Sequence, residues 1–179
     1  MAIQKSEERS SLPASSKDRG KKGDFRIPFS IGMLITLTGA YADAWWHLHG
    51  LAAQEGFFTP AHGVLYSGVL IMAVSIILWI MKKLELPVPI SRRASVLMRI
   101  GIVTMFAGAV FDFWWHSTFG FDTVAWTPPH LTATAGFLIL MTTATVSFGR
   151  KSAPFVKAAL ISSILLFIAL WATVIILTA

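Results

Sequence analysis

Six side chains that can bind a metal ion occur in two matching sets. In the second set, Asp112 and His116 stand four residues apart, and His130 follows fourteen residues later. Residues four apart on a helix share one face, so this carboxylate and imidazole can converge on one point. The short loop after His116 returns the second imidazole to about the same depth. Two imidazoles and one carboxylate suit Cu(II), non-haem Fe(II) or Zn, with coordination positions left open.

The same pattern occurs sixty-nine residues earlier, where the corresponding residues are Asp43, His47 and His62. The two sets contain four of the five histidines, and the fifth, His49, has Thr118 as its counterpart. The neighbouring residues that also align are Gly39 with Gly108, Trp45-Trp46 with Trp114-Trp115, Thr59-Pro60 with Thr127-Pro128, and Gly68 with Gly136. Such agreement predicts an internal repeat.

The repeat leaves several interpretations of the polar residues open. The two sets can form one dinuclear centre or two mononuclear sites, or one set can have lost its function. Asp112, His116 and His130 have the more apolar surroundings and the closer His spacing, which favours this set. In a purely structural interpretation, each Asp accepts a hydrogen bond from a His and the pairs only join helices.

The composition indicates a membrane scaffold around these residues. Hydrophobic residues make up 55% of the 179 and charged residues only 13%, against roughly 25% charged in soluble domains. The chain has no Cys, which excludes disulfides, thiolate ligands and thioether-linked haem. It also has no Gly-rich phosphate loop and no Ser/His/Asp order, so redox chemistry would depend on a bound metal.

Five segments are long enough for a membrane-spanning helix, which needs about 20 mainly apolar residues. The chain is therefore predicted to be an all-α integral membrane protein. The segments are Ile27 to about His49, Pro60 to slightly beyond Trp79, about Val96 to His116, Pro128 to Phe148, and Pro154 to Ala179. The first four form two tandem hairpin repeats, about 27–81 and 96–148, and an extra helix covers 154–179. Hairpins with one orientation predict a pseudo-twofold axis along the membrane normal.

The basic residues predict the orientation of the chain. All fifteen Lys and Arg lie in residues 1–26 or around the breaks near 82–99 and 150–157. By the positive-inside rule the N-terminus is cytoplasmic and the C-terminus extracytoplasmic. Residues 1–26 are expected to be a disordered basic cytoplasmic tail that attracts anionic lipid, ahead of a membrane domain over 27–179. This tail has no folded motif and one aromatic residue, Phe25, so nucleic acid is not an expected partner.

The predicted helices place the acids and histidines towards the extracytoplasmic face, where no basic side chain can neutralise them. Asp112 follows Arg99 by thirteen residues, roughly 20 Å along a helix and still within a hydrocarbon core about 30 Å thick. Acids at such a depth normally face the bundle interior, have a partner and serve a function. A cation is a suitable partner here.

The two sets resemble a copper site in one membrane subunit of the copper membrane monooxygenases, the particulate methane and ammonia monooxygenases. That site contains an Asp, a His four residues later and a second His further along. The segment FFTPAHGVLYSG, residues 57–68, is also similar to part of the archaeal ammonia-oxidising version. The resemblance implies copper-dependent oxidation of a small molecule with O2. A complete duplication of the motif departs from the family pattern.

We therefore expect a membrane metal-binding protein with copper, or alternatively iron or zinc, near the extracytoplasmic face. It would be a subunit or relative of a membrane monooxygenase. The alternative is a non-catalytic subunit, structural or metal-delivering, of a membrane complex. The small size and the unpaired fifth helix fit other membrane subunits or a homo-oligomer as partners. The inner halves of the helices offer only Ser, Thr and Tyr66 as polar residues, which disfavours a complete cation pathway.

Overall fold

The protein is all-helical in the computed structural model, which describes residues 22–49, 57–120, 126–148 and 152–178. The helices are α1 (Arg26–Leu48), α2 (Pro60–Ile80), α3 (Arg92–Phe119), α4 (Pro128–Phe148) and α5 (Pro154–Thr178). Two short strands, β1 (Gly23–Asp24) and β2 (Leu84–Glu85), complete the secondary structure of these residues. All five helices are long and apolar enough to cross a membrane. The predicted all-α class and five long apolar helices are confirmed.

The starts of three helices follow local signals in the sequence. Proline is tolerated in the first helical turn because the backbone N–H that it lacks has no partner there. At the start of α2, the Thr59 side chain also accepts a hydrogen bond from the His62 backbone N–H at 3.1 Å. The prolines that begin helices as predicted are Pro60 in α2, Pro128 in α4 and Pro154 in α5.

Helix α3 is longer at both ends than the apolar run suggested. It begins at Arg92, four residues before the predicted start, and ends at Phe119, three residues after the predicted end. The Ser91 side chain caps its first turn by accepting a hydrogen bond from the Ala94 backbone N–H at 3.1 Å. The apolar run shows which residues lie in the bilayer, whereas this cap determines where the helix begins.

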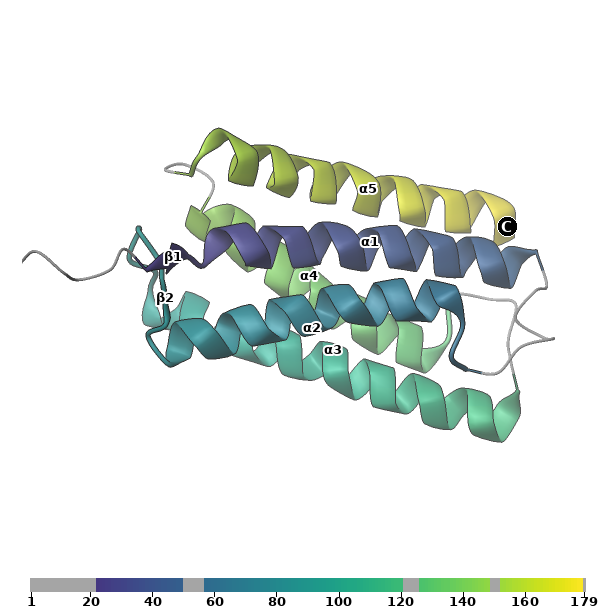
Figure 1. Ribbon diagram of the computed structural model, residues 1–179. Coiled ribbons are helices and arrows are strands. Elements are labelled where there is room, and N and C mark those ends of the chain that lie inside the picture. The colour runs from purple at the N-terminus through teal and green to yellow at the C-terminus, as the bar shows by residue number, and fades with distance from the viewer. Residues whose placement is uncertain (1–21, 50–56, 121–125, 149–151, 179) are drawn as a thin grey trace, which may run out of the picture.

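The helices form one bundle in which α1 packs mainly on α2, α3 mainly on α4, and α5 along α1. Figure 1 shows the ends of α1 and α3 at the same end of the bundle as the starts of α2 and α4. We call this the histidine end, because His47, His62, His116 and His130 belong to it. The other end carries β1 and β2 and is called the strand end.

Corresponding glycines bring the helices of each pair into close contact. A Cβ atom added to Gly39 would lie 2.3 Å from the Leu65 backbone nitrogen, and one added to Gly108 would lie 2.7 Å from that of Ala133. Both distances are too short for any side chain. The α1–α2 and α3–α4 contacts therefore depend on glycine at matching positions, and both crossings lie near the histidine end.

The residues just before α1 are part of the folded body. Strand β1 pairs in parallel with β2, and the Phe25 backbone N–H donates to the Glu85 carbonyl at 2.9 Å. The Phe25 side chain is fully buried and contacts the rings of Phe29 and Trp79. The polar tail expected over residues 1–26 therefore does not extend to residues 22–26, because Phe25 has an apolar site to occupy. Residues 1–21 lie outside the described residues.

Candidate metal centre

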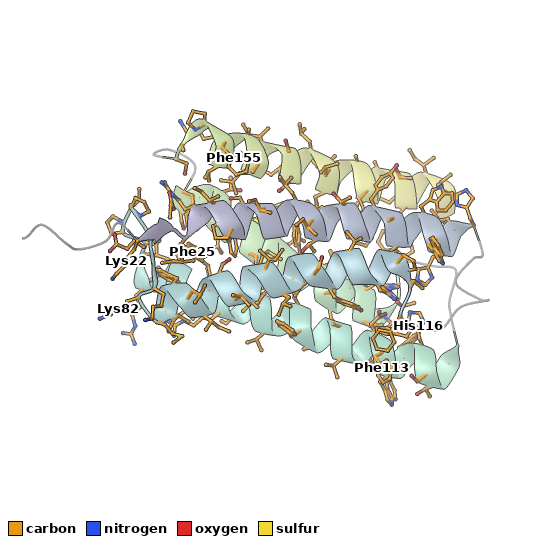
Figure 2. All side chains as sticks on the ribbon, viewed as in Figure 1. Lys22, Phe25, Lys82, Phe113, His116 and Phe155 are labelled. Atoms are coloured by element: carbon orange, nitrogen blue, oxygen red, sulfur yellow. The ribbon has the colours of Figure 1, made fainter. Side chains whose placement is uncertain are left out.

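All six residues predicted as ligands lie in one cluster at the histidine end. Two come from the end of α1, two from the end of α3, and one each from the starts of α2 and α4. Five of them are buried and His130 is partly exposed. Figure 2 places His116 near one end of the bundle and Lys22 and Lys82 near the other. The cluster members are Asp43, His47, His62, Asp112, His116 and His130.

Asp112 faces imidazoles from both helix pairs. Its Oδ1 atom lies 3.2 Å from Nε2 of His116 and 3.3 Å from Nε2 of His130. Its Oδ2 atom lies 3.8 Å from Nε2 of His62 and accepts a hydrogen bond from the Tyr66 hydroxyl at 3.2 Å. The two oxygens of one carboxylate thus point towards different sets of ligands.

Asp43 lies among the imidazoles of its own helix pair. Its Oδ1 atom is 3.2 Å from Nε2 of His62 and 3.8 Å from Nε2 of His47. The His47 ring stacks on the His116 ring with centroids 5.6 Å apart, which brings the two sets together. Two groups of three possible donor atoms each fit within 4.8 Å, one made of Asp43, His47 and His62 and the other of His47, His116 and His130.

The outer nitrogen of three imidazoles is held by a neighbour in the chain. Nδ1 of His62 donates to the Phe57 carbonyl and Nδ1 of His116 to the Gly120 carbonyl, the latter at 3.1 Å. A carbonyl can only accept, so these Nδ1 atoms carry a proton and a neutral ring presents the lone pair of Nε2 to the cluster. Nδ1 of His130 lies 2.9 Å from the Thr127 hydroxyl oxygen. Such partners orient the histidine ligands of metal sites.

Gly120 is a residue that the sequence did not single out. Its φ of 81° is in the left-handed region that favours glycine. Its backbone N–H donates to the His116 carbonyl at 3.1 Å, while its own carbonyl accepts from the His116 ring. The end of α3 thereby fixes the rotation of one candidate ligand. A glycine shortly after the last residue of a predicted helix would have been the signal.

No protein-family model, curated protein or solved structure matches this chain. Inferences about the cluster therefore depend on its own chemistry.

The cluster has more acceptors than protons to share between them. With neutral rings, the Nε2 lone pairs of His62 and His116 face carboxylate oxygens, which are also acceptors. Nε2 of His62 and Oδ1 of Asp112 are buried and make no hydrogen bond of normal geometry to any described residue. A buried carboxylate is costly without a compensating positive charge. Either added protons or a metal cation can provide that charge.

Positive side chains lie far from the cluster in the described part of the chain. The Lys and Arg residues there belong to the strand end or to the helix halves nearest to it. These residues are Lys22, Arg26, Lys82, Lys83, Arg92, Arg93, Arg99 and Lys157. The two carboxylates of the cluster therefore have imidazoles, and not a Lys or Arg, as their potential cationic neighbours.

Tyr66 and His49 differ in their relation to the cluster. Besides its hydrogen bond to Asp112, the Tyr66 ring stacks on the His62 ring with centroids 5.5 Å apart. In the second repeat the matching position is Thr134, so Tyr66 makes the two halves unequal. His49 is exposed, stacks on Trp45 and hydrogen-bonds to its carbonyl at 2.7 Å. This histidine lies outside the cluster, in agreement with its lack of a counterpart in the repeat.

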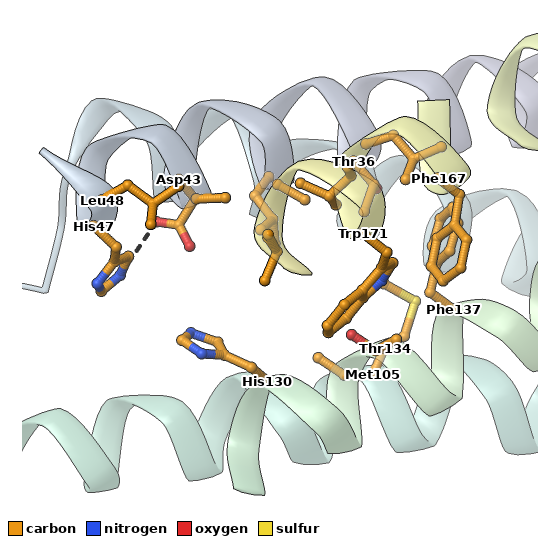
Figure 3. Close-up of a pocket in the computed structure, with 17 residues that line it drawn as sticks. Thr36, Asp43, His47, Leu48, Met105, His130, Thr134, Phe137, Phe167 and Trp171 are labelled. Atoms are coloured by element: carbon orange, nitrogen blue, oxygen red, sulfur yellow. Dashed lines mark ion pairs between the residues drawn. The ribbon is translucent and has the colours of Figure 1, made fainter. Parts of the chain in front are cut away.

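A cavity of about 130 Å³ lies beside the cluster, between α1, α4 and α5. Figure 3 shows His47 and His130 on one side of it and Phe137 and Phe167 on the other. Most of its walls are apolar, and Trp171 of α5 contributes to them. Engineered protein cavities of roughly 150 Å³ hold a molecule of the size of benzene. The site thus combines possible ligands with space for a small, mainly apolar molecule.

Proposed function

We propose that this protein is a multi-pass membrane metalloprotein that uses copper or non-haem iron to oxidise a small molecule. The observation that supports it best is the convergence of four imidazoles and two carboxylates at one buried point. Four helices far apart in sequence supply these donors. A set of helix-joining hydrogen bonds would not require both repeats to direct their donors to the same place.

The membrane assignment rests on the outer surface of the bundle as well as on helix length. Large apolar side chains are exposed on every helix, and α5 carries a row of them. Those on α5 include Ile161, Leu165, Ile168 and Ile176. In a bilayer this surface contacts lipid or another membrane protein. The basic strand end is then cytoplasmic and the histidine end extracytoplasmic, which gives the N-in, C-out orientation.

The repeat gives the membrane domain its internal symmetry in this proposal. The helix pairs α1–α2 and α3–α4 are taken as two copies of one hairpin, with the pseudo-twofold axis passing through the cluster. The matched close approaches at Gly39 and Gly108 support this, because both copies use the same position to bring their helices together. Helix α5 then provides the wall of the cavity that the repeat lacks.

The donor set and the cavity together favour a redox metal over a structural one. Imidazole and carboxylate suit Cu(II), Fe(II) and Zn, but structural zinc sites are usually closed by four protein ligands. Here His47 and His130 also line a cavity with room for a small molecule. The motif resemblance to the copper membrane monooxygenases makes copper the first candidate and a related oxidation of a small molecule the proposed activity.

Metal content tests this function. Protein extracted with its native lipid should contain about one or two Cu or Fe per chain by inductively coupled plasma mass spectrometry. The double variant His116→Ala/His130→Ala should lose that metal, whereas His49→Ala should retain it, since His49 lies outside the cluster. A folded preparation that binds none of Cu, Fe and Zn when each is offered would contradict the proposal. The cluster would then be a proton-sharing contact in a structural membrane protein.

A further inference from the structure

The two oxygens of Asp112 are directed at two different groups of imidazoles. Oδ1 faces His116 and His130 of the second helix pair, at 3.2 and 3.3 Å. Oδ2 faces His62 of the first helix pair at 3.8 Å. A carboxylate that presents one oxygen to each of two ligand groups has the arrangement of a bridge between two cations.

The separations within each group match those between ligands of one ion. Ligands about 2.0 Å from a tetrahedral metal ion lie roughly 3.3 Å from one another. The distances from Asp112 to His116 and His130 have this value, and so does the 3.2 Å between Asp43 and His62. Each half of the cluster is therefore spaced for an ion of its own.

A small cavity separates the two halves. It measures about 40 Å³, and its lining includes Asp43, His62, Asp112 and His130. One water molecule needs roughly 10–15 Å³ of such space, so the cavity has room for more than a single ion. Six donors also exceed the four that one tetrahedral ion takes.

We propose that the cluster is a dinuclear metal centre bridged by Asp112, an inference that rests on the metal-binding function proposed above. One ion is held by His116, His130 and Oδ1 of Asp112. The other is held by Oδ2 of Asp112 together with Asp43, His47 and His62. A single carboxylate bridge suits the separation of roughly 3.5–4 Å found in two-metal sites.

The bridge is assigned to Asp112 rather than to its counterpart Asp43 because their surroundings differ. Asp43 lies within 4 Å of His47 and His62, both of its own helix pair. Asp112, in contrast, contacts imidazoles of both pairs. The Tyr66 hydroxyl donates to Oδ2 of Asp112 and holds the plane of the carboxylate. Asp43 is therefore a terminal ligand of one ion.

Copper titration with electron paramagnetic resonance tests the bridge. Metal-free full-length protein in lipid nanodiscs receives zero to three equivalents of Cu(II), and bound copper is counted after desalting. We expect about two Cu per chain, with a signal that accounts for less than half of the bound copper because the two spins couple. In Asp112→Asn the signal per bound copper should rise at least twofold. The matched variant Asp43→Asn should bind fewer ions, and His49→Ala should behave as the wild type.

Each other outcome has a separate meaning. One copper per chain with its full signal would overturn the dinuclear centre but leave the metal-binding function in place. Two coppers with two full, uncoupled signals would also overturn it, since the sites would then be separate. No bound copper, iron or zinc would contradict the proposed function itself. The count and signal of the wild type decide the question even where Asp112→Asn does not fold.

Discussion

The two ends of the bundle neutralise their buried carboxylates in different ways. At the strand end, Asp24 accepts hydrogen bonds from the Arg26 side chain at 2.7, 3.0 and 3.1 Å and from its backbone N–H at 2.9 Å. At the histidine end, Asp43 and Asp112 face imidazoles. The chain supplies its own permanent cation at one end and only conditional ones at the other.

This difference separates a structural ion pair from a site for an external cation. The Arg26 guanidinium is charged at every relevant pH and has a fixed planar geometry, and it also donates to the Ser152 hydroxyl at 3.2 Å. It thereby ties the start of α1 to the segment before α5. An imidazole can instead be neutral and bind a metal through Nε2. The histidine end is thus suited to gain or lose its cation while the strand end keeps its shape.

Removal of the metal should produce the largest effect and should act on the histidine end. A ligand at a thousand times its dissociation constant stabilises the folded state by about 4 kcal/mol. We therefore expect chelation to lower the thermal midpoint by several degrees and metal addition to restore it, as measured by circular dichroism in lipid nanodiscs. In His116→Ala/His130→Ala the chelator should change nothing. An equal shift in that variant would show that the chelator acts elsewhere.

The substitution Tyr66→Phe should come next, because it removes one hydrogen bond to Asp112 and leaves all six ligands. Partners of metal ligands typically contribute 10–100-fold to metal affinity. We expect a loss of about that size in a competition titration with a chelator of known affinity. Thr134→Val, at the matching position of the second repeat, is the control and should retain wild-type affinity. Equal losses in both variants would mean that the two halves are not distinguished by Tyr66.

The sequence predicted the elements of the fold well because they follow from local patterns. Apolar length indicated the five helices, and proline indicated three of their starts. The proximity of Asp112 and His116 was also predictable, since their spacing places them on one helical face. The start of α3 was missed because the Ser91 cap lies in a polar stretch that apolar length does not report.

The geometry of the cluster could not be predicted in the same way. Whether the two sets meet depends on how α1–α2 packs against α3–α4, which no spacing within one repeat determines. The contact between Tyr66 and Asp112 joins positions 46 residues apart, and the second copy has Thr134 in place of the tyrosine. An alignment of the repeats treats such a residue as a mismatch, although it produces the asymmetry between Asp43 and Asp112.

Disruption of the ion pair at the strand end should have a smaller effect that leaves metal binding intact. Asp24→Asn removes the negative charge opposite Arg26, whose side chain is 6% exposed. Hydrogen bonds to charged groups contribute about 1.5–3 kcal/mol, and the partial exposure of Asp24 reduces this to about 1 kcal/mol. We expect a small decrease in thermal midpoint and an unchanged metal content. A loss of metal would show that the two ends are coupled.

The pH dependence of this ion pair should be the smallest effect. Partial burial of Asp24 opposes its ionisation, but hydrogen bonds from the Arg26 side chain and backbone and the nearby positive charge outweigh it, so the pKa lies below the ordinary 3.8. A carboxyl group with a lowered pKa stabilises the folded state fully above its unfolded pKa and loses this contribution as the pH falls through the folded pKa. The stability difference between wild type and Asp24→Asn should therefore be constant above about pH 5 and shrink below pH 3.8. Thermal unfolding of both proteins between about pH 3 and pH 7 measures this, and a difference that grows on acidification would contradict the role of Arg26.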